Sequence, residues 1–274
     1  MHRAALAALG RTDFTYQHLP VPPELLAETV RALPAAGFVG ANVTIPHKEA
    51  VLALATTATA RARAIGAANT LSFDPGTGAV HADNTDAPGV IAALPVPPRG
   101  ARALILGAGG SARAVAWALR DAGAREVLVW NRNPERAEVL AADLGVTATR
   151  TAAPADVLIN CTPAGLAGQP PQFKDWPLDA DHLSSYPCVV DLVYVSEGTT
   201  HLVSAAAQSG CTVVDGLEIL VRQGAESFSA WTGLEAPLQA MRQGAARGRP
   251  ARAHEPAPAP EVRDRAGERR GAGP

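Results

Sequence analysis

The sequence contains few residues of several kinds, and each shortage excludes a class of protein. Its 274 residues include three cysteines, at the scattered positions Cys161, Cys188 and Cys211. Three cysteines are too few for a disulfide framework, and no pair of them has the spacing of metal ligands. We therefore expect each cysteine to be a small core residue and the protein to be cytoplasmic. No apolar run approaches the roughly 18 residues of a membrane span, and residues 1–4 begin no signal peptide. We therefore expect neither membrane insertion nor export.

Lysine and asparagine are also scarce. Only Lys48 and Lys174 are lysines among 24 basic residues, and three of the six asparagines, Asn42, Asn69 and Asn84, lie around Lys48 in the sequence. A guanidinium stays charged, whereas an amine can release a proton, so a lysine in an arginine-rich chain suits proton transfer. These rare polar residues indicate a candidate site in the first third of the chain.

Bulky apolar residues are nearly absent from the C-terminal end. Residues 242–274 contain eight arginines and four acidic residues, which gives this segment a charge of +4. The whole chain has a net charge of −2, so residues 1–241 carry −6. Proline, glycine and arginine cannot build a core, so we expect a disordered tail over residues 245–274. A basic tail suits nucleic acid, but acids are interspersed and no aromatic residue is present to stack on bases. We therefore expect a solvated tail.

A glycine-rich turn follows the apolar residues 103–106 and precedes the Ala-rich amphipathic run 111–122. This order is typical of a buried strand, a tight turn and a helix that bind a dinucleotide. Gly107 permits the turn, Gly109 lets backbone N–H groups approach a pyrophosphate, and the helix N-terminus adds partial positive charge. The predicted cofactor contacts of the turn are Gly107, Ala108, Gly109, Gly110 and Ser111.

A second apolar strand, residues 126–130, ends where such folds bind the adenosine ribose. An NAD site has a carboxylate there, whereas this sequence has Asn131 and Arg132, with Arg136 one helical turn later. A guanidinium can hold a 2′-phosphate, so NADP is favoured over NAD. The alternative is that both arginines are solvated surface charges. The predicted contacts at this end are Asn131, Arg132, Asn133, Pro134, Glu135 and Arg136.

Strands and helices alternate along most of the chain. We expect helices over residues 1–9, 23–33, 56–65, 85–94, 111–122, 134–144 and 200–209, a helix from 46 onward and a long helix from 216, and strands over 13–19, 38–45, 103–106, 126–130, 156–160, 189–193 and 212–215. A further strand around residue 70 and a turn at 74–78 predict a hairpin. Parallel sheet is the expectation, because crossover helices join the strands.

These elements predict an α/β protein of two domains. Residues 1–85 form the first domain, and residues 86–216 form a Rossmann-like domain with a parallel sheet, joined through a linker helix at 86–94. Helices in residues 217–244 are expected to pack back on the first domain, ahead of the tail. Whether the protein is a monomer or a homodimer stays open.

Several motifs, in this order, resemble those of the shikimate dehydrogenases. They are residues 41–49 (ANVTIPHKE), 66–70 (GAANT), 83–86 (DNTD), the glycine turn, Asn131-Arg132, 191–194 (DLVY) and 223–225 (QGA). The resemblance spans about residues 1–244. It implies a substrate domain followed by an NADP-binding domain, and the interconversion of 3-dehydroshikimate and shikimate, a step of chorismate and aromatic amino acid biosynthesis.

The resemblance also assigns site residues. It implies that Lys48 and Asp86 are the catalytic pair, and that Thr44, Asn69, Asp86, Tyr194 and Gln223 contact the substrate. It further implies that Leu192 and Gly216 join the glycine turn and residues 131–136 in contacting the cofactor, with Asn42 as a supporting residue. The alternatives are that Lys48 pairs with Glu49 or caps a helix, and that Asp86 only stabilises a helix N-terminus. Tyr194 and Gln223 have the alternative of being ordinary packing or surface residues.

The sequence departs from the family pattern at three places. A strand and a Ser-x-Ser-Pro segment, whose serines bind the substrate carboxylate, usually precede the Met-His at which this sequence begins, and we expect a misassigned start codon. Asn133 replaces a threonine, which weakens the preference for NADP, and Ala87-Pro88 replaces a glycine, which stiffens the hinge. The alternatives are a quinate/shikimate dehydrogenase that uses NAD and a non-catalytic NADP-binding protein.

Overall fold

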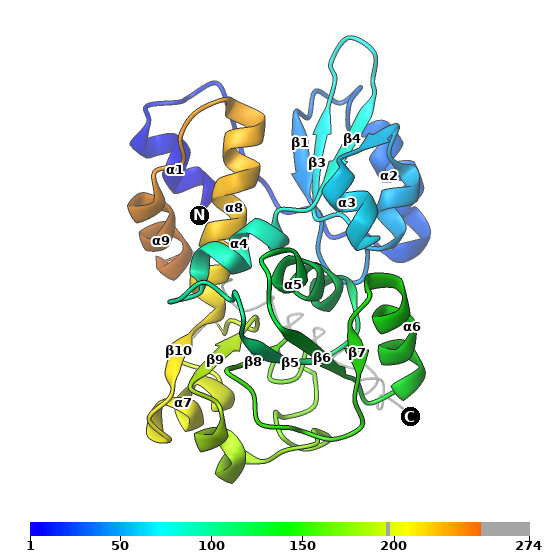
Figure 1. Cartoon of the computed structure of the whole chain (residues 1–274). Helices are drawn as coiled ribbons and strands as arrows, with labels where there is room; N and C mark the ends of the chain where they lie inside the picture. Colours follow the sequence, from blue (N-terminus) through cyan, green and yellow to red (C-terminus); the bar gives the residue numbers. More distant parts are fainter. Residues whose placement is uncertain (196–197, 248–274) are drawn as a thin grey trace, which may run out of the picture.

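A computed structural model describes residues 1–195 and 198–247. It contains a four-stranded sheet of order β1-β3-β4-β2 and a six-stranded sheet of order β10-β9-β8-β5-β6-β7. Figure 1 shows the smaller sheet above the larger one, with the helices α4 and α5 between them. The predicted α/β class with two regions of sheet is confirmed.

The six-stranded sheet is parallel throughout, as predicted. Its strands are β5 (Arg102–Leu106), β6 (Glu126–Trp130), β7 (Thr147–Ala148), β8 (Val157–Asn160), β9 (Cys188–Asp191) and β10 (Thr212–Val214). Successive side chains point to opposite faces, so Ile105 lies in the core on one face and Leu104 in the core on the other. Both faces are covered, which explains why these strands are continuous apolar runs.

Helices cover the two faces of this sheet. On one face lie α5 (Gly110–Asp121) and α6 (Pro134–Leu144), and on the other lie the 3-10 helix η3 (Ala180–Ser185) and α7 (His201–Gln208). The start of α6 follows from its sequence, because Pro134 suits the first helical position and Asn133 Oδ1 accepts the Glu135 N–H at 3.0 Å. Gly145, at φ +63°, ends the helix.

The smaller sheet is mixed. Its strands are β1 (Gly40–Asn42), β2 (Thr57–Ala58), β3 (Thr70–Phe73) and β4 (Val80–Asp83), and its helical segments are η1 (Pro23–Leu25), α2 (Leu26–Ala32), η2 (Ala50–Leu54) and α3 (Ala60–Ile65). The predicted hairpin joins β3 to β4. Asp74 Oδ1 closes its turn by accepting the N–H groups of Gly76 and Thr77.

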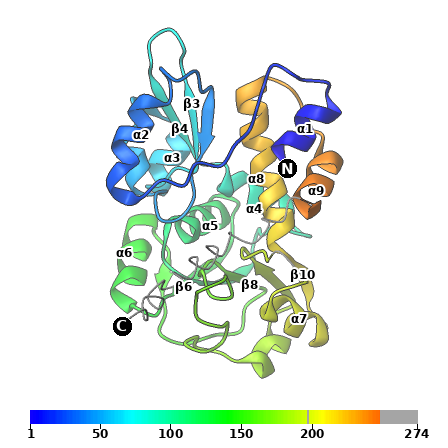
Figure 2. The ribbon, with the colours of Figure 1, turned by 180° about the vertical axis from the view of Figure 1, so that it is seen from behind.

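Four further helices connect and flank the sheets: α1 (His2–Ala8), α4 (Asp86–Ala93), α8 (Gly216–Thr232) and α9 (Leu238–Arg247). The long helix α8 passes from the larger sheet to the smaller one, where the Trp231 indole N–H donates to the Leu71 carbonyl at 2.9 Å. Gly40 has no side chain, which leaves room for this indole ring. Figure 2 shows α1 and α9 packed on α8 beside the smaller sheet.

Three expectations about the first half of the chain are wrong. Residues 13–19 form no strand. Their alternation arises because Tyr16 packs inward, stacked on His2 at 4.4 Å between ring centroids. Residues 57–58 form β2 rather than helix, because they pair with β4. The helix expected from residue 46 is a series of turns followed by the 3-10 helix η2.

Other expectations concern single residues and the chain end. Cys161 and Cys188 are buried as predicted, and Cys211 is half-buried. The predicted tail starts inside α9, which ends at Arg247, and residues 248–274 lie outside the described residues. Within the described part of the chain, no helix is both long and apolar enough to cross a bilayer.

Candidate active site

Lys48 and Asp86 lie together between the two sheets. Lys48 belongs to the turns between β1 and η2, and Asp86 is the first residue of α4. The Lys48 Nζ atom is 2.6 Å from Asp86 Oδ2, and the two side chains are only 12% and 10% exposed. The N-terminus of α4 adds partial positive charge that stabilises the carboxylate. Lys48 thus pairs with Asp86, whereas its neighbour Glu49 is exposed.

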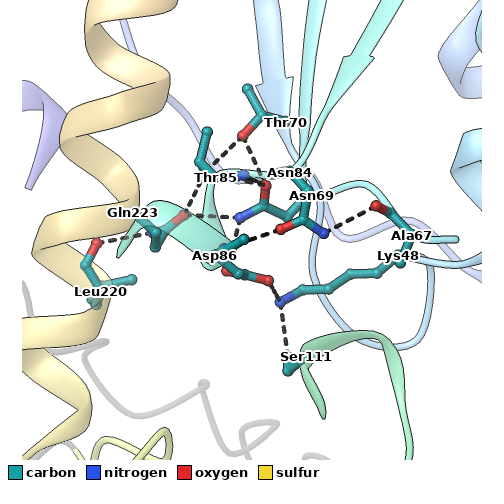
Figure 3. Close-up of polar contacts among 11 residues, drawn as sticks. Lys48, Ala67, Asn69, Thr70, Asn84, Thr85, Asp86, Ser111, Leu220 and Gln223 are labelled. Atoms are coloured by element: carbon teal, nitrogen blue, oxygen red, sulfur yellow. Dashed lines mark hydrogen bonds and ion pairs between the residues drawn. The ribbon is translucent and has the colours of Figure 1, made fainter. Parts of the chain in front are cut away.

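Asn69 connects this ion pair to α8. Its Nδ2 atom donates to Asp86 Oδ1 at 2.8 Å and to Gln223 Oε1 at 3.2 Å, and its Oδ1 atom accepts the Thr85 N–H at 2.7 Å. Gln223 in turn donates to the Leu220 carbonyl at 2.9 Å. Figure 3 shows Asn69 and Lys48 both bonded to the Asp86 carboxylate. Four of the predicted residues, Lys48, Asn69, Asp86 and Gln223, therefore form one connected cluster.

A layer of buried polar side chains supports the cluster. The Thr70 and Thr85 hydroxyls are 3.0 Å apart, and both also lie 3.1 Å from Asn69 Oδ1. Thr85 occupies the expected N-cap position of α4, but its side chain bonds to Asn69 rather than to the helix. Asn84 Nδ2 donates to the Ala67 carbonyl at 3.0 Å. These partners hold each amide in one orientation, as burial of polar groups requires.

The glycine turn reaches the same place from the larger sheet. Gly107 has φ +112°, and a Cβ atom there would lie 3.1 Å from the Cys161 carbonyl carbon. A Cβ atom at Gly110 would lie 2.8 Å from Lys48 Cβ, so a side chain there would collide, whereas at Gly107 the positive φ and the close approach together favour glycine. At Gly109 the corresponding space is open. The Ser111 Oγ atom accepts a hydrogen bond from Lys48 Nζ at 3.0 Å, so the turn adjoins the ion pair.

The end of β6 is open to solvent. Asn131 Nδ2 donates to the Asn133 carbonyl at 2.8 Å, which shapes the turn into α6. The Arg132 side chain is 72% exposed and 3.5 Å from Asp175, and Arg136 is exposed in the first turn of α6. A guanidinium held so loosely remains accessible to a phosphate group.

Four other predicted residues, Thr44, Tyr194, Leu192 and Gly216, make no side-chain hydrogen bond to this cluster among the described residues. Thr44 is exposed, and the Tyr194 side chain is on the surface at 49% exposure. Leu192 is half-buried, and Gly216 is buried at the start of α8, where a Cβ atom would lie 2.5 Å from the Val193 carbonyl oxygen. Close packing therefore explains the glycine at position 216.

Sequence comparisons agree with this geometry. Three family models match the chain: the shikimate dehydrogenase substrate binding domain over residues 1–71, the shikimate / quinate 5-dehydrogenase model over 95–165, and the shikimate 5'-dehydrogenase C-terminal domain over 216–243. A shikimate dehydrogenase (NADP(+)) of Methylobacterium radiotolerans is 46% identical over 235 residues, which cover 80% of this chain and 81% of the relative. The chain belongs to the shikimate dehydrogenase family.

Two further relatives extend this result. A shikimate dehydrogenase (NADP(+)) of Paracoccus denitrificans is 46% identical over 232 residues, covering 80% of each protein. A crystal structure of shikimate 5-dehydrogenase from Thermus thermophilus in complex with NADP(H) and shikimate is 39% identical, with a TM-score of 0.78, and covers 90% of this chain and 92% of that one. The predicted two-part shikimate dehydrogenase architecture is confirmed.

In this member of the shikimate dehydrogenase family, the glycine turn and the end of β6 have the chemical groups that NADP binding requires. The first N–H groups of the 12-residue helix α5 have no intrahelical partner, and the open space at Gly109 lets a pyrophosphate approach them. At the other end, Asn131 stands where an NAD site has a carboxylate, and the Arg132 and Arg136 guanidiniums are exposed beside it. A 2′-phosphate would meet positive charge there.

Sequence reasoning missed one polar cluster beside the shikimate dehydrogenase site. The carboxylate of Asp191, at the end of β9, accepts hydrogen bonds from Asn160 and Gln172 at 2.8 Å each and from Thr200 at 2.6 Å. Burial raises the pKa of Asp191, and these donors oppose that shift. The cluster holds the segments after β8 and β9. Its only sequence signal was Asp191 in the DLVY motif, because the donors come from distant segments.

Proposed function

We propose that this chain is an NADP-dependent shikimate dehydrogenase, an oxidoreductase that interconverts 3-dehydroshikimate and shikimate. The observation that carries the proposal is the buried Lys48–Asp86 ion pair beside Ser111 of the glycine turn. An amine and a carboxylate there stand next to the segment that suits a dinucleotide. The relatives named as NADP(+)-dependent shikimate dehydrogenases support the same activity.

The proposed roles of Lys48 and Asp86 follow from the chemistry of alcohol oxidation. Bound NADP⁺ would accept the hydride from the carbon, and bound NADPH would supply it in the reverse direction. Loss of hydride requires the hydroxyl proton to leave. In this direction the lone pair of the Lys48 amine accepts that proton and the amine becomes an ammonium, and in the reverse direction the ammonium returns the proton to the carbonyl oxygen. Two of the ammonium N–H groups point to Asp86 and Ser111, which leaves a third for the substrate. Asp86 holds the amine and balances its charge.

The proposed substrate contacts are polar groups around this pair. Asn69 and Gln223 offer an amide framework that is already fixed by hydrogen bonds. Thr44 and Tyr194 have exposed hydroxyls, which are accessible to a ligand rich in hydroxyl groups. We also assign Asp86 to substrate binding, because its carboxylate lies at the centre of the cluster.

The proposed cofactor contacts fall into three groups. The pyrophosphate would lie on residues 107–111 and the adenosine 2′-phosphate on residues 131–136, and Leu192 and Gly216 form the third group. We further propose the division into residues 1–85, 86–216 and 217–244 as substrate domain, cofactor domain and returning helices. The three free cysteines suit a cytoplasmic location.

The test is turnover by the purified full chain. Shikimate and NADP⁺ are mixed with the protein, and NADPH is followed by absorbance. The wild-type chain should turn over, Lys48→Ala should lose about 10²–10⁴-fold in kcat, and Lys174→Ala should behave as wild type, because Lys174 is the other lysine and is exposed.

Each contrary result has a distinct meaning. Absence of turnover by the wild-type chain contradicts the proposal, and NADP binding without turnover supports a non-catalytic NADP-binding protein instead. A higher kcat/KM with NAD and quinate than with NADP and shikimate supports a quinate/shikimate dehydrogenase.

A further inference from the structure

Arg113 joins the two halves of the molecule away from the reacting centre. It lies in α5, and its Nε atom donates to the Ile65 carbonyl, the last of α3, at 2.6 Å. Its Nη1 atom is 2.9 Å from Asp143 Oδ2 in α6. The Arg113 side chain is only 14% exposed, so its fork of N–H groups is held in one geometry. The planar guanidinium thus links the helices of the larger sheet to the end of α3.

The turn that Arg113 holds, residues 65–68, also supports the backbone of Lys48. Gly66 ends α3 at φ +74°, and a Cβ atom there would lie 2.8 Å from Arg113 Nη2, so glycine lets the guanidinium approach. Two residues later, the Ala68 N–H donates to the Lys48 carbonyl at 2.8 Å. A movement of this turn would therefore move the lysine backbone with it.

The other end of Lys48 reaches the same helix. Its Nζ atom donates to Ser111 at 3.0 Å, and its Cβ atom packs against Gly110. Three residues at the start of α5 thus contact Lys48 or the turn beneath it. Gly110 adjoins the side-chain stem, Ser111 bonds to the amine, and Arg113 bonds to the turn of residues 65–68. The lysine is located relative to the cofactor turn at both ends.

We propose that Arg113 is a positioning residue for the reaction, which acts on Lys48 through the turn of residues 65–68. This inference rests on the function proposed above, because Lys48 is the group that is positioned. Without the guanidinium, the Ile65 carbonyl loses its donor, and the backbone beneath Lys48 can shift relative to α5. A shift of about 1 Å in a catalytic group can cost about 10²-fold in rate.

The test compares Arg113→Ala with the matched control Asp143→Ala. The control removes the Arg113–Asp143 ion pair but keeps the contact to Ile65. The measurements are kcat and both KM values for the full chain, below the melting temperature of each variant. NADPH titration counts the binding-competent sites, so that unfolded protein does not contribute. Arg113→Ala should lower kcat about tenfold or more, with both KM values within about twofold of wild type, and Asp143→Ala should keep the wild-type kcat.

Arg113→Lys separates the contact from the charge. An ammonium group cannot serve Ile65 and Asp143 with the geometry of the fork, so this variant should have an intermediate kcat. An equal fall of kcat in Arg113→Ala and Asp143→Ala would show a merely structural role and overturn the inference. A wild-type kcat in Arg113→Ala would overturn it while the proposed function stands. A wild-type chain without turnover would remove the proposed function itself.

Discussion

The Lys48–Asp86 cluster and the end of β6 differ in how far their side chains are fixed by contacts within the protein. Around Lys48 and Asp86 the side chains are buried and bonded to one another, and Asn69 alone bonds to Asp86, Gln223 and Thr85. At the end of β6, Arg132 and Arg136 are exposed. The first region is organised in advance for proton transfer, whereas the second offers charge that a phosphate would order. Changes in the first should alter kcat, and changes in the second should alter KM.

Among changes that compare the two ends of the site, the largest effect is expected from Asp86→Asn. The amide keeps the shape of the carboxylate but removes the charge that holds the Lys48 ammonium, so kcat should fall about 10²–10³-fold. The KM for NADP should stay within about twofold of wild type, because Asp86 is not among the residues assigned to the cofactor. Steady-state kinetics measure both. Asp143→Asn, which changes a half-exposed carboxylate, is the control. A rise in KM for NADP with unchanged kcat would contradict the separation of roles.

A smaller effect is expected at the other end, from Arg132→Ala combined with Arg136→Ala. Hydrogen bonds to charged groups are worth about 1.5–3 kcal/mol, so the KM for NADP should rise about 10–100-fold. The KM for NAD should not change, because NAD lacks the 2′-phosphate. The control is Arg150→Ala, which removes an exposed guanidinium paired with Glu138 of α6. Equal losses with NADP and NAD would contradict this assignment.

The smallest effect concerns stability. Burial lowers the pKa of His2 from 6.5 to about 4, and the nearby Asn42 side chain opposes this shift. The unfolded chain therefore binds a proton that the folded chain excludes between pH 6.5 and about 4. The resulting loss of stability is absent above pH 6.5 and grows as the pH falls through this window.

Urea unfolding at pH 8 and pH 5 measures this loss. The free energy of unfolding of the wild-type chain should fall by about 1–2 kcal/mol more than that of His2→Phe. Phenylalanine keeps a ring to stack on Tyr16 but does not titrate. An identical pH dependence in the two proteins would show that the His2 ring is hydrated or bonded in solution.

The sequence predicted the elements of the larger sheet better than those of the smaller one. Strands buried on both faces are long apolar runs, and helix signals such as Pro134 and Gly145 are local, so α6 has the predicted bounds. In residues 13–19, the alternation of Phe14, Tyr16 and His18 predicted a strand. An alternating pattern indicates which side chains face the protein but not whether a neighbouring strand is present, and Tyr16 is half-buried and stacked on His2 instead.

For the site, the pattern of motifs predicted which residues meet better than what holds them. Lys48 and Asp86, 38 residues apart, are bonded as the motif order implied. Asp191 and Arg113 carried no comparable signal. The donors to Asp191 come from β8 and two loops. In the sequence, Arg113 is indistinguishable from any other arginine on an amphipathic helix. Contacts between distant segments depend on the completed fold, and single-sequence patterns do not contain them.

The contact between Gly110 and Lys48 limits how this protein can be re-engineered. A change of coenzyme preference from NADP to NAD could be sought at two segments, the glycine turn and the end of β6. Any side chain added at Gly110 would push against the stem of the lysine, so a change meant for the coenzyme would also disturb the proton-transfer chemistry. Residues 131–136 carry no such linkage, and libraries for altered coenzyme use belong there.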